Sequence, residues 1–144
     1  MRYLLDTNVL SELVKPSPAG RVAAWVDAQS PLDFAVSVLS LGEIEKAIAR
    51  LPEGKRRSAL LLWAQRELPT QFVGRVLSVN TAAAVAWGAL SASGERAGRP
   101  LPVVDGLLLG TAQAHGLTLV TRNAVDCAGR GIPVYDPWTS GLHD

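Results

Sequence analysis

Short runs of consecutive apolar residues alternate along the chain with longer segments in which apolar residues recur every three or four positions. The first pattern predicts buried strands, and the second predicts amphipathic helices. The apolar runs predict strands at residues 3–5, 34–38, 75–79, 117–121 and 133–135. The helical spacing predicts helices at residues 8–14, 22–30, 39–51, 55–68, 81–93 and 105–115. Thr81 is expected to cap the start of one of these helices, and Gly116 to end another.

This alternation of strands and helices predicts an α/β fold with three layers, α/β/α, and a mainly parallel sheet of about five strands. The chain has 144 residues, of which 48% are hydrophobic and 19% charged, so it can bury a core of its own. We therefore expect residues 1–144 to form one domain. In such folds the functional site lies beyond the carboxyl ends of the strands, and the residues that follow the strands are the first candidates.

Charge and cysteine content exclude several classes of protein. The 14 Lys and Arg residues nearly balance the 13 Asp and Glu residues, which argues against polyanion binding through overall charge. The single cysteine, Cys127, excludes an internal disulfide and a zinc site made of several thiolates. Asp6 comes too early for a signal peptide, and no apolar stretch approaches the roughly 20 residues of a membrane span. We expect a cytoplasmic protein with no membrane contact.

Three carboxylates are expected at the carboxyl edge of the sheet, and each has apolar neighbours. Asp6 ends the first strand, Glu43 lies early in the helix after the second, and Asp105 follows two valines at the start of a helix. Carboxylates in apolar surroundings are costly unless they are hydrogen bonded, protonated or bound to a cation. Several at one sheet edge repel one another, which a metal ion would offset. Oxygen ligands without His or Cys favour Mg²⁺ or Mn²⁺.

Each acid also has a simpler interpretation when it is taken alone. Asp6 and Asp105 are well placed to be helix N-caps, and Glu43 to be a solvated helix residue. Asp126, which follows the fourth predicted strand, is typical of a loop acid. The convergence of three acids on one edge of the sheet is what favours a metal site over these separate interpretations.

Five segments, spread in order over nearly the whole chain, resemble the motifs of one family. They are residues 5–12 (LDTNVLSE), 37–43 (SVLSLGE), 103–108 (VVDGLL, followed by Thr111 and Ala112), 119–123 (LVTRN) and 132–138 (IPVYDPW). The first four resemble the motifs of PIN-domain ribonucleases, the toxins of VapBC-type toxin–antitoxin pairs. The last is similar to the ending of the FitB-like subgroup.

The resemblance implies a five-stranded parallel sheet flanked by helices and an endoribonuclease site that uses Mg²⁺ or Mn²⁺. Asp6, Glu43 and Asp105 match the acidic positions of the family and are the expected metal ligands. Asn123 stands where many relatives have Asp, and the nearest acid is Asp126. We expect Asp126 to be the fourth catalytic acid and to contribute more to metal binding than Asn123.

The expected reaction is hydrolysis of an RNA phosphodiester bond. Glu43 would be either a further metal ligand or the group that orients the attacking water. Arg122 is a candidate phosphate contact. Hydrogen bonds that orient the carboxylates are expected from Thr7, Asn8, Thr121 and Asn123.

The resemblance also implies a cognate antitoxin that covers the site, and a homodimer that could belong to a larger toxin–antitoxin assembly. Apolar residues near the site would form either the groove for that partner or part of the core. They are Leu10, Leu13, Val14, Val22 and Trp25.

Two other functions compete with the ribonuclease. A phosphatase of the haloacid-dehalogenase type would use Asp6 as its nucleophile, but it needs an acid where Asn8 stands and a late lysine, and no lysine follows Lys55. A catalytically inactive PIN-fold binding module would not need three acids, so the presence of Asp6, Glu43 and Asp105 together argues against it.

Overall fold

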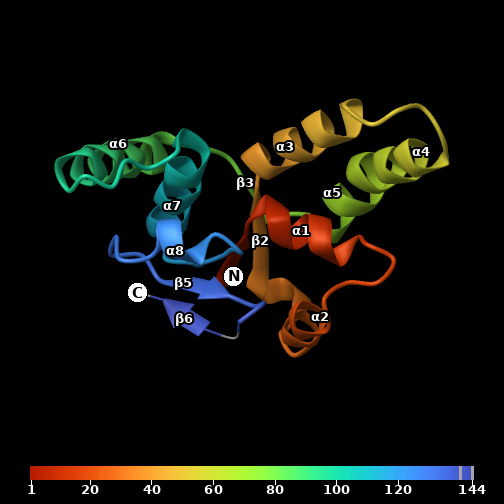
Figure 1. The fold of residues 1–144 in the computed structure, drawn as a ribbon, viewed down its shortest axis with the longest axis horizontal. Helices are drawn as coiled ribbons and strands as arrows, with labels where there is room; N and C mark the ends of the chain where they lie inside the picture. The colour runs from red at the N-terminus through yellow and green to blue at the C-terminus, as the bar shows by residue number, and fades with distance from the viewer. Residues whose placement is uncertain (140, 144) are drawn as a thin grey trace.

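The computed structural model describes residues 1–139 and 141–143, and in this part of the chain six strands form one sheet (Figure 1). The strand order is β3-β2-β1-β4-β5-β6, in which the first five strands are parallel and β6 pairs with β5 in the antiparallel sense. The strands are β1 (Tyr3–Leu5), β2 (Phe34–Ser37), β3 (Val76–Leu77), β4 (Thr118–Val120), β5 (Val134–Asp136) and β6 (Gly141–His143).

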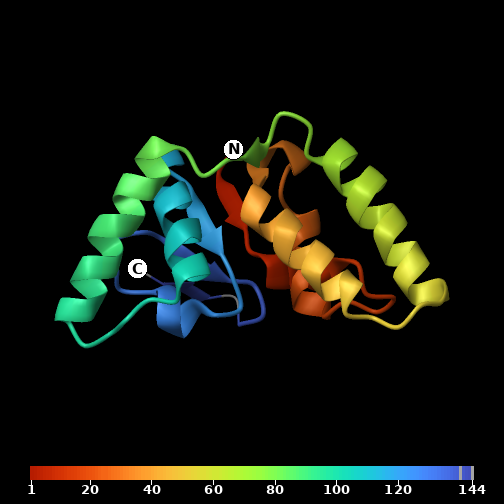
Figure 2. The ribbon, with the colours of Figure 1, turned by 90° about the horizontal axis from the view of Figure 1, so that it is seen from above.

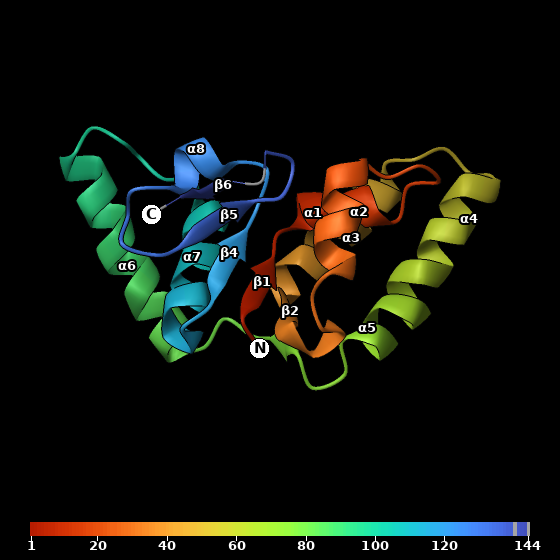
Figure 3. The ribbon, with the colours of Figure 1, turned by 90° about the horizontal axis from the view of Figure 1, so that it is seen from below.

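Helices fill the connections between the strands. The longer ones are α1 (Thr7–Leu13), α2 (Gly20–Asp27), α3 (Val38–Ala49), α4 (Lys55–Leu62), α6 (Thr81–Arg96) and α7 (Val103–His115). The short ones are η1 (Pro31–Asp33), η2 (Trp63–Glu67), α5 (Leu68–Gln71) and α8 (Ala124–Cys127). Helices α6 and α7 lie side by side at one end of the molecule, and α3 and α4 lie towards the other (Figures 2 and 3). No helix in the described ranges is both long and apolar enough to cross a membrane.

The two faces of the sheet pack into separate apolar clusters because successive strand residues point to opposite sides. Leu4 packs with Leu108 and Leu109 of α7, whereas its neighbour Leu5 packs with Ile44 of α3. The side chains of these leucines are almost completely buried, and full burial of such a side chain contributes about 1.5–3 kcal/mol to stability. Helices therefore cover both faces, which confirms the predicted three-layer α/β/α fold.

The sequence left open whether five apolar residues near the site form the core or a partner groove. The structure places four of them in or against the core and one in a cavity. Leu10 and Val22 are buried in the core, and Leu13 and Trp25 pack against the same cluster. The Trp25 ring stacks on Tyr135 with a centroid separation of 4.8 Å. Val14 instead lines a mostly apolar cavity of about 360 Å³ between α1, α3 and α4.

The structure shows that several predicted helix and strand ends were wrong, and the local hydrogen bonding explains one of them. The helix predicted to end at residue 68 continues past Pro69 to Gln71, because η2 is a π-helical turn. Its wider hydrogen bonding, from the Leu68 amide to the Trp63 carbonyl, accommodates a proline that lacks an amide donor. The strand predicted at residues 75–79 is reduced to β3, and β6 was not predicted.

Helix caps also differ from the expected ones. The side chain of Asn80, rather than Thr81, caps α6 by accepting a hydrogen bond from the Ala83 amide at 2.9 Å. Helix α7 begins two residues before Asp105, which therefore lies in the first turn and is not the N-cap. Gly116 ends α7 with a φ of 66°, as predicted, in the left-handed region that favours glycine.

The close contact between α6 and α7 makes Gly110 sensitive to substitution. A Cβ atom at this position would lie 2.5 Å from the Ala83 carbonyl oxygen, which is backbone and cannot move aside cheaply. We expect Gly110→Ala to destabilise the protein by about 1–3 kcal/mol. Gly88→Ala on α6 is the matched control, because its Cβ would meet nothing within 4 Å and the helix should gain about 0.5–1 kcal/mol. Urea unfolding measures both changes, and equal effects would contradict the packing argument.

Candidate active site

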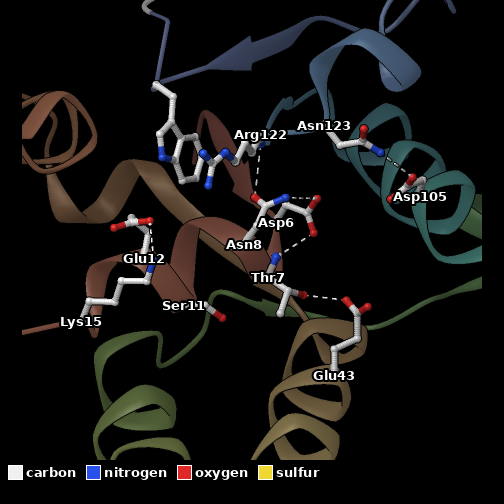
Figure 4. A pocket seen from close by; sticks show the side chains of 11 residues that line it. Asp6, Thr7, Asn8, Ser11, Glu12, Lys15, Glu43, Asp105, Arg122 and Asn123 are labelled. Atoms are coloured by element: carbon white, nitrogen blue, oxygen red, sulfur yellow. Dashed lines mark hydrogen bonds and ion pairs between the residues drawn. The ribbon is translucent and has the colours of Figure 1, made fainter. Parts of the chain in front are cut away.

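A cavity of about 480 Å³ lies at the carboxyl ends of β1 and β4 and brings together all three carboxylates singled out in the sequence (Figure 4). Asp6 follows β1, Glu43 comes from the middle of α3, and Asp105 comes from the first turn of α7. The lining residues are Asp6, Thr7, Asn8, Ser11, Glu12, Lys15, Glu43, Asp105, Arg122, Asn123 and Trp138.

Asp6 is the most buried of the three acids and accepts hydrogen bonds on both carboxylate oxygens. Its Oδ1 accepts from the Thr7 amide at 2.7 Å, so Asp6 is the N-cap of α1 as well as a lining residue. Its Oδ2 accepts from the Thr121 hydroxyl at 2.8 Å and from Asn8 Nδ2 at 3.4 Å. Burial raises the pKa of Asp6, and the charges of Asp105 and Glu43 raise it further, against these hydrogen bonds.

Asp105 and Glu43 are each held by one neighbouring side chain. Asn123 Nδ2 donates to Asp105 Oδ2 at 3.0 Å, and the Thr7 hydroxyl donates to Glu43 Oε1 at 2.6 Å. Burial is the main cause that raises the pKa of Asp105, and the charges of Asp126 and Glu43 add to it. The carboxylates are thus crowded enough to affect one another electrostatically.

The loop after β4 ties this site to the start of α1. Asn8 Nδ2 donates to the Thr121 hydroxyl at 3.3 Å, and Asn8 Oδ1 accepts from the Arg122 amide at 3.2 Å. Thr121 does not line the cavity, but it is fully buried and its hydroxyl accepts from the Asn123 amide. Hydrogen bonds to the carboxylates therefore come from all four residues expected to make them: Thr7, Asn8 and Thr121 contact Asp6 or Glu43, and Asn123 contacts Asp105.

Asp126 lies outside the lining of this cavity. It is exposed on α8, and its backbone carbonyl accepts hydrogen bonds from Arg99 and Arg130. Its charge still reaches Asp105, whose pKa it raises. The direct contact to Asp105 comes from Asn123 instead. That Asp126 contributes more to metal binding than Asn123 stays a prediction.

Sequence reasoning missed four residues that line the pocket: Ser11, Glu12, Lys15 and Trp138. Glu12 is buried and accepts from Lys15 Nζ and from the Ala19 amide, each at 3.0 Å. The three-residue spacing between an acid in the last turn of a predicted helix and a lysine just after its end was a usable signal for this ion pair. Trp138 comes from the segment after β5, and its neighbours in sequence give no sign that it lines this pocket.

Glu12 predicts a pH dependence of stability. The hydrogen bonds from Ala19 and Lys15 hold the pKa of Glu12 below its ordinary value of 4.5. The stabilisation is therefore present above pH 4.5 and is lost as the pH falls through the lower value of the folded protein. We expect Glu12→Gln to melt at a lower temperature than the unmodified protein at pH 7, with the difference shrinking below pH 4.5. Glu45→Gln, on the exposed side of α3, is the control and should show no such trend.

The donor set fits a hard divalent cation. Asp6, Glu43 and Asp105 offer only oxygen ligands, as Mg²⁺ and Mn²⁺ prefer. Burial, and to a smaller extent the neighbouring acids, raises the pKa of Asp6 and of Asp105, so their ionised forms are disfavoured and a bound cation would offset that cost. Among the side chains of residues 1–139, no three His, Cys, Asp or Glu groups are already gathered closely enough to form a metal cluster.

Comparison with known families matches residues 3–125 to the PIN domain. The chain belongs to the PIN-domain family. This PIN domain is 33% identical to the VapC ribonuclease Y4jK of Sinorhizobium fredii, over 94% of the chain and 96% of that protein. It is 30% identical to Toxin FitB of Neisseria gonorrhoeae, over 94% of the chain and 97% of that protein. These matches confirm the resemblance seen in the motifs.

The same fold occurs in a solved structure. A chain in the crystal structure of FitAcB from Neisseria gonorrhoeae matches this PIN domain with a TM-score of 0.89 and 30% identity, and the match covers 94% of this chain and 98% of that one. The structure of FitAB bound to an IR36 DNA fragment gives the same TM-score at 29% identity. Both matches extend beyond residue 125, the end of the family match, and so include the region that follows α8.

Proposed function

We propose that residues 1–144 act as one PIN domain that hydrolyses RNA with the help of a divalent metal ion, and that this protein is the toxin of a toxin–antitoxin pair. The observation that carries the proposal is the gathering of Asp6, Glu43 and Asp105 in one pocket at the carboxyl edge of the sheet. The names of the relatives, a VapC ribonuclease and the toxin FitB, support the same activity.

Asp6 and Asp105 would hold Mg²⁺ or Mn²⁺, and Glu43 would add a third carboxylate or orient the attacking water. The chemistry that such an ion supplies when bound is a lowered pKa of water and compensation of charge on the phosphate. Thr121 and Thr7 fix the orientation of Asp6, and Thr7 also fixes Glu43. We further propose that Asp126 adds negative charge beside Asp105.

Partners follow from the relatives. The structural relatives were solved as FitAcB and FitAB, the latter bound to DNA. We propose that this chain likewise pairs with a cognate antitoxin that covers the pocket, forms a homodimer, and meets its RNA substrate in the cytoplasm. Co-expression with the adjacent reading frame, followed by purification through a tag on this chain, would show whether the two proteins form a complex.

Neither alternative function agrees as well with the site. Asn8, which stands where a haloacid-dehalogenase phosphatase needs an acid, is occupied by hydrogen bonds to Asp6 and Thr121. The family match also places the chain among PIN domains. An inactive binding module would not require desolvated, mutually repelling acids in one pocket.

The decisive test is incubation of the purified, antitoxin-free protein with total RNA and Mg²⁺ or Mn²⁺. We expect discrete cleavage products, which sequencing of the RNA ends would map. A preparation that melts cooperatively but cleaves no RNA with either ion would overturn the proposal.

A further inference from the structure

Two cationic side chains line the pocket together with its acids. Lys15 and Arg122 both line the cavity that holds Asp6 and Asp105. In Figure 4, Lys15 lies at one end of the view and Asp105 at the other, with Asp6 and Arg122 between them. The metal-binding proposal uses neither cation, so their presence in the pocket calls for a separate explanation.

Arg122 is held by an aromatic ring and not by an acid. Its guanidinium carbon lies 5.1 Å from the centroid of the Trp138 ring, a distance at which cation–π attraction is effective. Among the side chains that the structure describes, Arg122 has no carboxylate within ion-pair distance. Hydrogen bonds and, to a smaller extent, the charge of Arg122 lower the pKa of Glu12, but the planar donors of Arg122 make no ion pair within residues 1–139 and are free for bidentate recognition of a phosphate.

Lys15, unlike Arg122, is held by an ion pair with a buried acid. Its Nζ atom lies 3.0 Å from Oε1 of the buried Glu12, yet 53% of the lysine side chain is exposed. Glu12 is itself fixed by the Ala19 amide at the start of α2. An ammonium group has three donors, so Lys15 can contact Glu12 and an incoming anion together.

We propose that Lys15 and Arg122 bind the RNA phosphate next to the cleaved one, and that Glu12 and Trp138 are positioning residues for these two cations. This inference rests on the proposed ribonuclease function. Four carboxylates line the pocket, those of Asp6, Glu12, Glu43 and Asp105. One divalent ion offsets only two of these charges, so side-chain cations in the same pocket are needed to hold a phosphate backbone there. A site made of two cations and no base-reading group would bind single-stranded RNA with little sequence preference of its own.

The first test measures binding without cleavage. All variants carry Asp105→Asn, and the probe is a short fluorescein-labelled single-stranded RNA titrated at several salt concentrations. Arg122→Gln and Lys15→Gln should each weaken binding roughly tenfold and reduce the slope of log affinity against log salt by about 0.7. Arg122→Lys should keep the slope but lose affinity. Arg96→Gln, at the exposed end of α6, is the control with no change.

The second test asks whether the contact is with a phosphate. In the cleaving protein, Arg122→Gln and Trp138→Leu should raise KM roughly tenfold with little change in kcat. An RNA with one neutral methylphosphonate beside the mapped cleavage site should lose the same affinity, and Arg122→Gln should cost nothing more with this RNA. Additive losses would overturn the proposed contact.

The remaining outcomes separate this inference from the proposed function. If the protein cleaves RNA but both cation variants match the Arg96→Gln control, the inference fails and the ribonuclease function stands. If the protein neither binds nor cleaves RNA with Mg²⁺, both fail. If the variants keep RNA affinity but lose antitoxin binding, the cations serve the partner protein and the inference is wrong.

Discussion

Asp105→Asn is expected to lower the rate of RNA cleavage by about a hundredfold or more, because it removes one charge from the proposed metal site. The fold should tolerate the change, since an amide oxygen can still accept the hydrogen bond from Asn123. Burial and neighbouring charges disfavour the ionised form of Asp105. At neutral pH and without metal, the variant should therefore melt at the same or a higher temperature than the unmodified protein. Cleavage assays and melting curves in chelator measure the two effects.

Asp6→Asn is expected to differ from Asp105→Asn in its effect on stability. It should abolish cleavage as well, but both oxygens of Asp6 accept hydrogen bonds, from Thr7 on one side and from Thr121 and Asn8 on the other. In Asp6→Asn the NH₂ group of the new side chain would face one of these donors, and the lost hydrogen bond would cost about 1–3 kcal/mol of stability. Active Asp105→Asn protein would contradict the site assignment. Equal melting temperatures for the two variants would contradict the hydrogen-bond argument.

Addition of Mg²⁺ or Mn²⁺ to chelator-treated protein is expected to restore cleavage and to raise the melting temperature. A ligand at 100 times its Kd stabilises the folded state by about 2.7 kcal/mol, which for a chain of this size corresponds to roughly 5–10 °C. The physical reason is that burial, together with the neighbouring acids, disfavours the ionised carboxylates, and a bound cation offsets that cost. Thermal melts with and without metal measure the stabilisation independently of activity.

The same measurement in single variants identifies the ligands. Asp105→Asn should lose most of the metal-induced shift, and Glu95→Gln on α6 is the control that should keep it. Asp126→Ala is predicted to weaken Mn²⁺ binding more than Asn123→Ala does. Weaker binding in the Asn123 variant alone would reverse that order, and a full shift in Asp105→Asn would exclude Asp105 as a ligand.

The layer architecture and the acidic edge were predictable because both depend on local pattern. Buried parallel strands are nearly continuous apolar runs, and Leu4 and Leu5 lie in such a run with Asp6 directly after it. Since parallel strands end at one edge, an acid after one strand and acids in the first turns of the helices beside it are expected near that edge. Glu43 lies farther along α3 than this rule assumes, but it still reaches the same pocket. The convergence of Asp6, Glu43 and Asp105 was therefore accessible from the order of residues.

Other features depend on contacts that local periodicity does not encode. The hydrogen bond between Asn123 and Asp105 and the packing of Arg122 on Trp138 depend on how the loop after β4 and the segment after β5 return to the pocket. The strand order, with β4 beside β1, also joins segments more than a hundred residues apart. Sequence by itself determined the order along the chain of the five parallel strands and the longer helices, and the acids at the sheet edge, because these depend on near neighbours; it did not determine every boundary, nor β6. Tertiary structure alone decided which polar groups pair across that edge, since pairing needs the relative positions of elements distant in the chain.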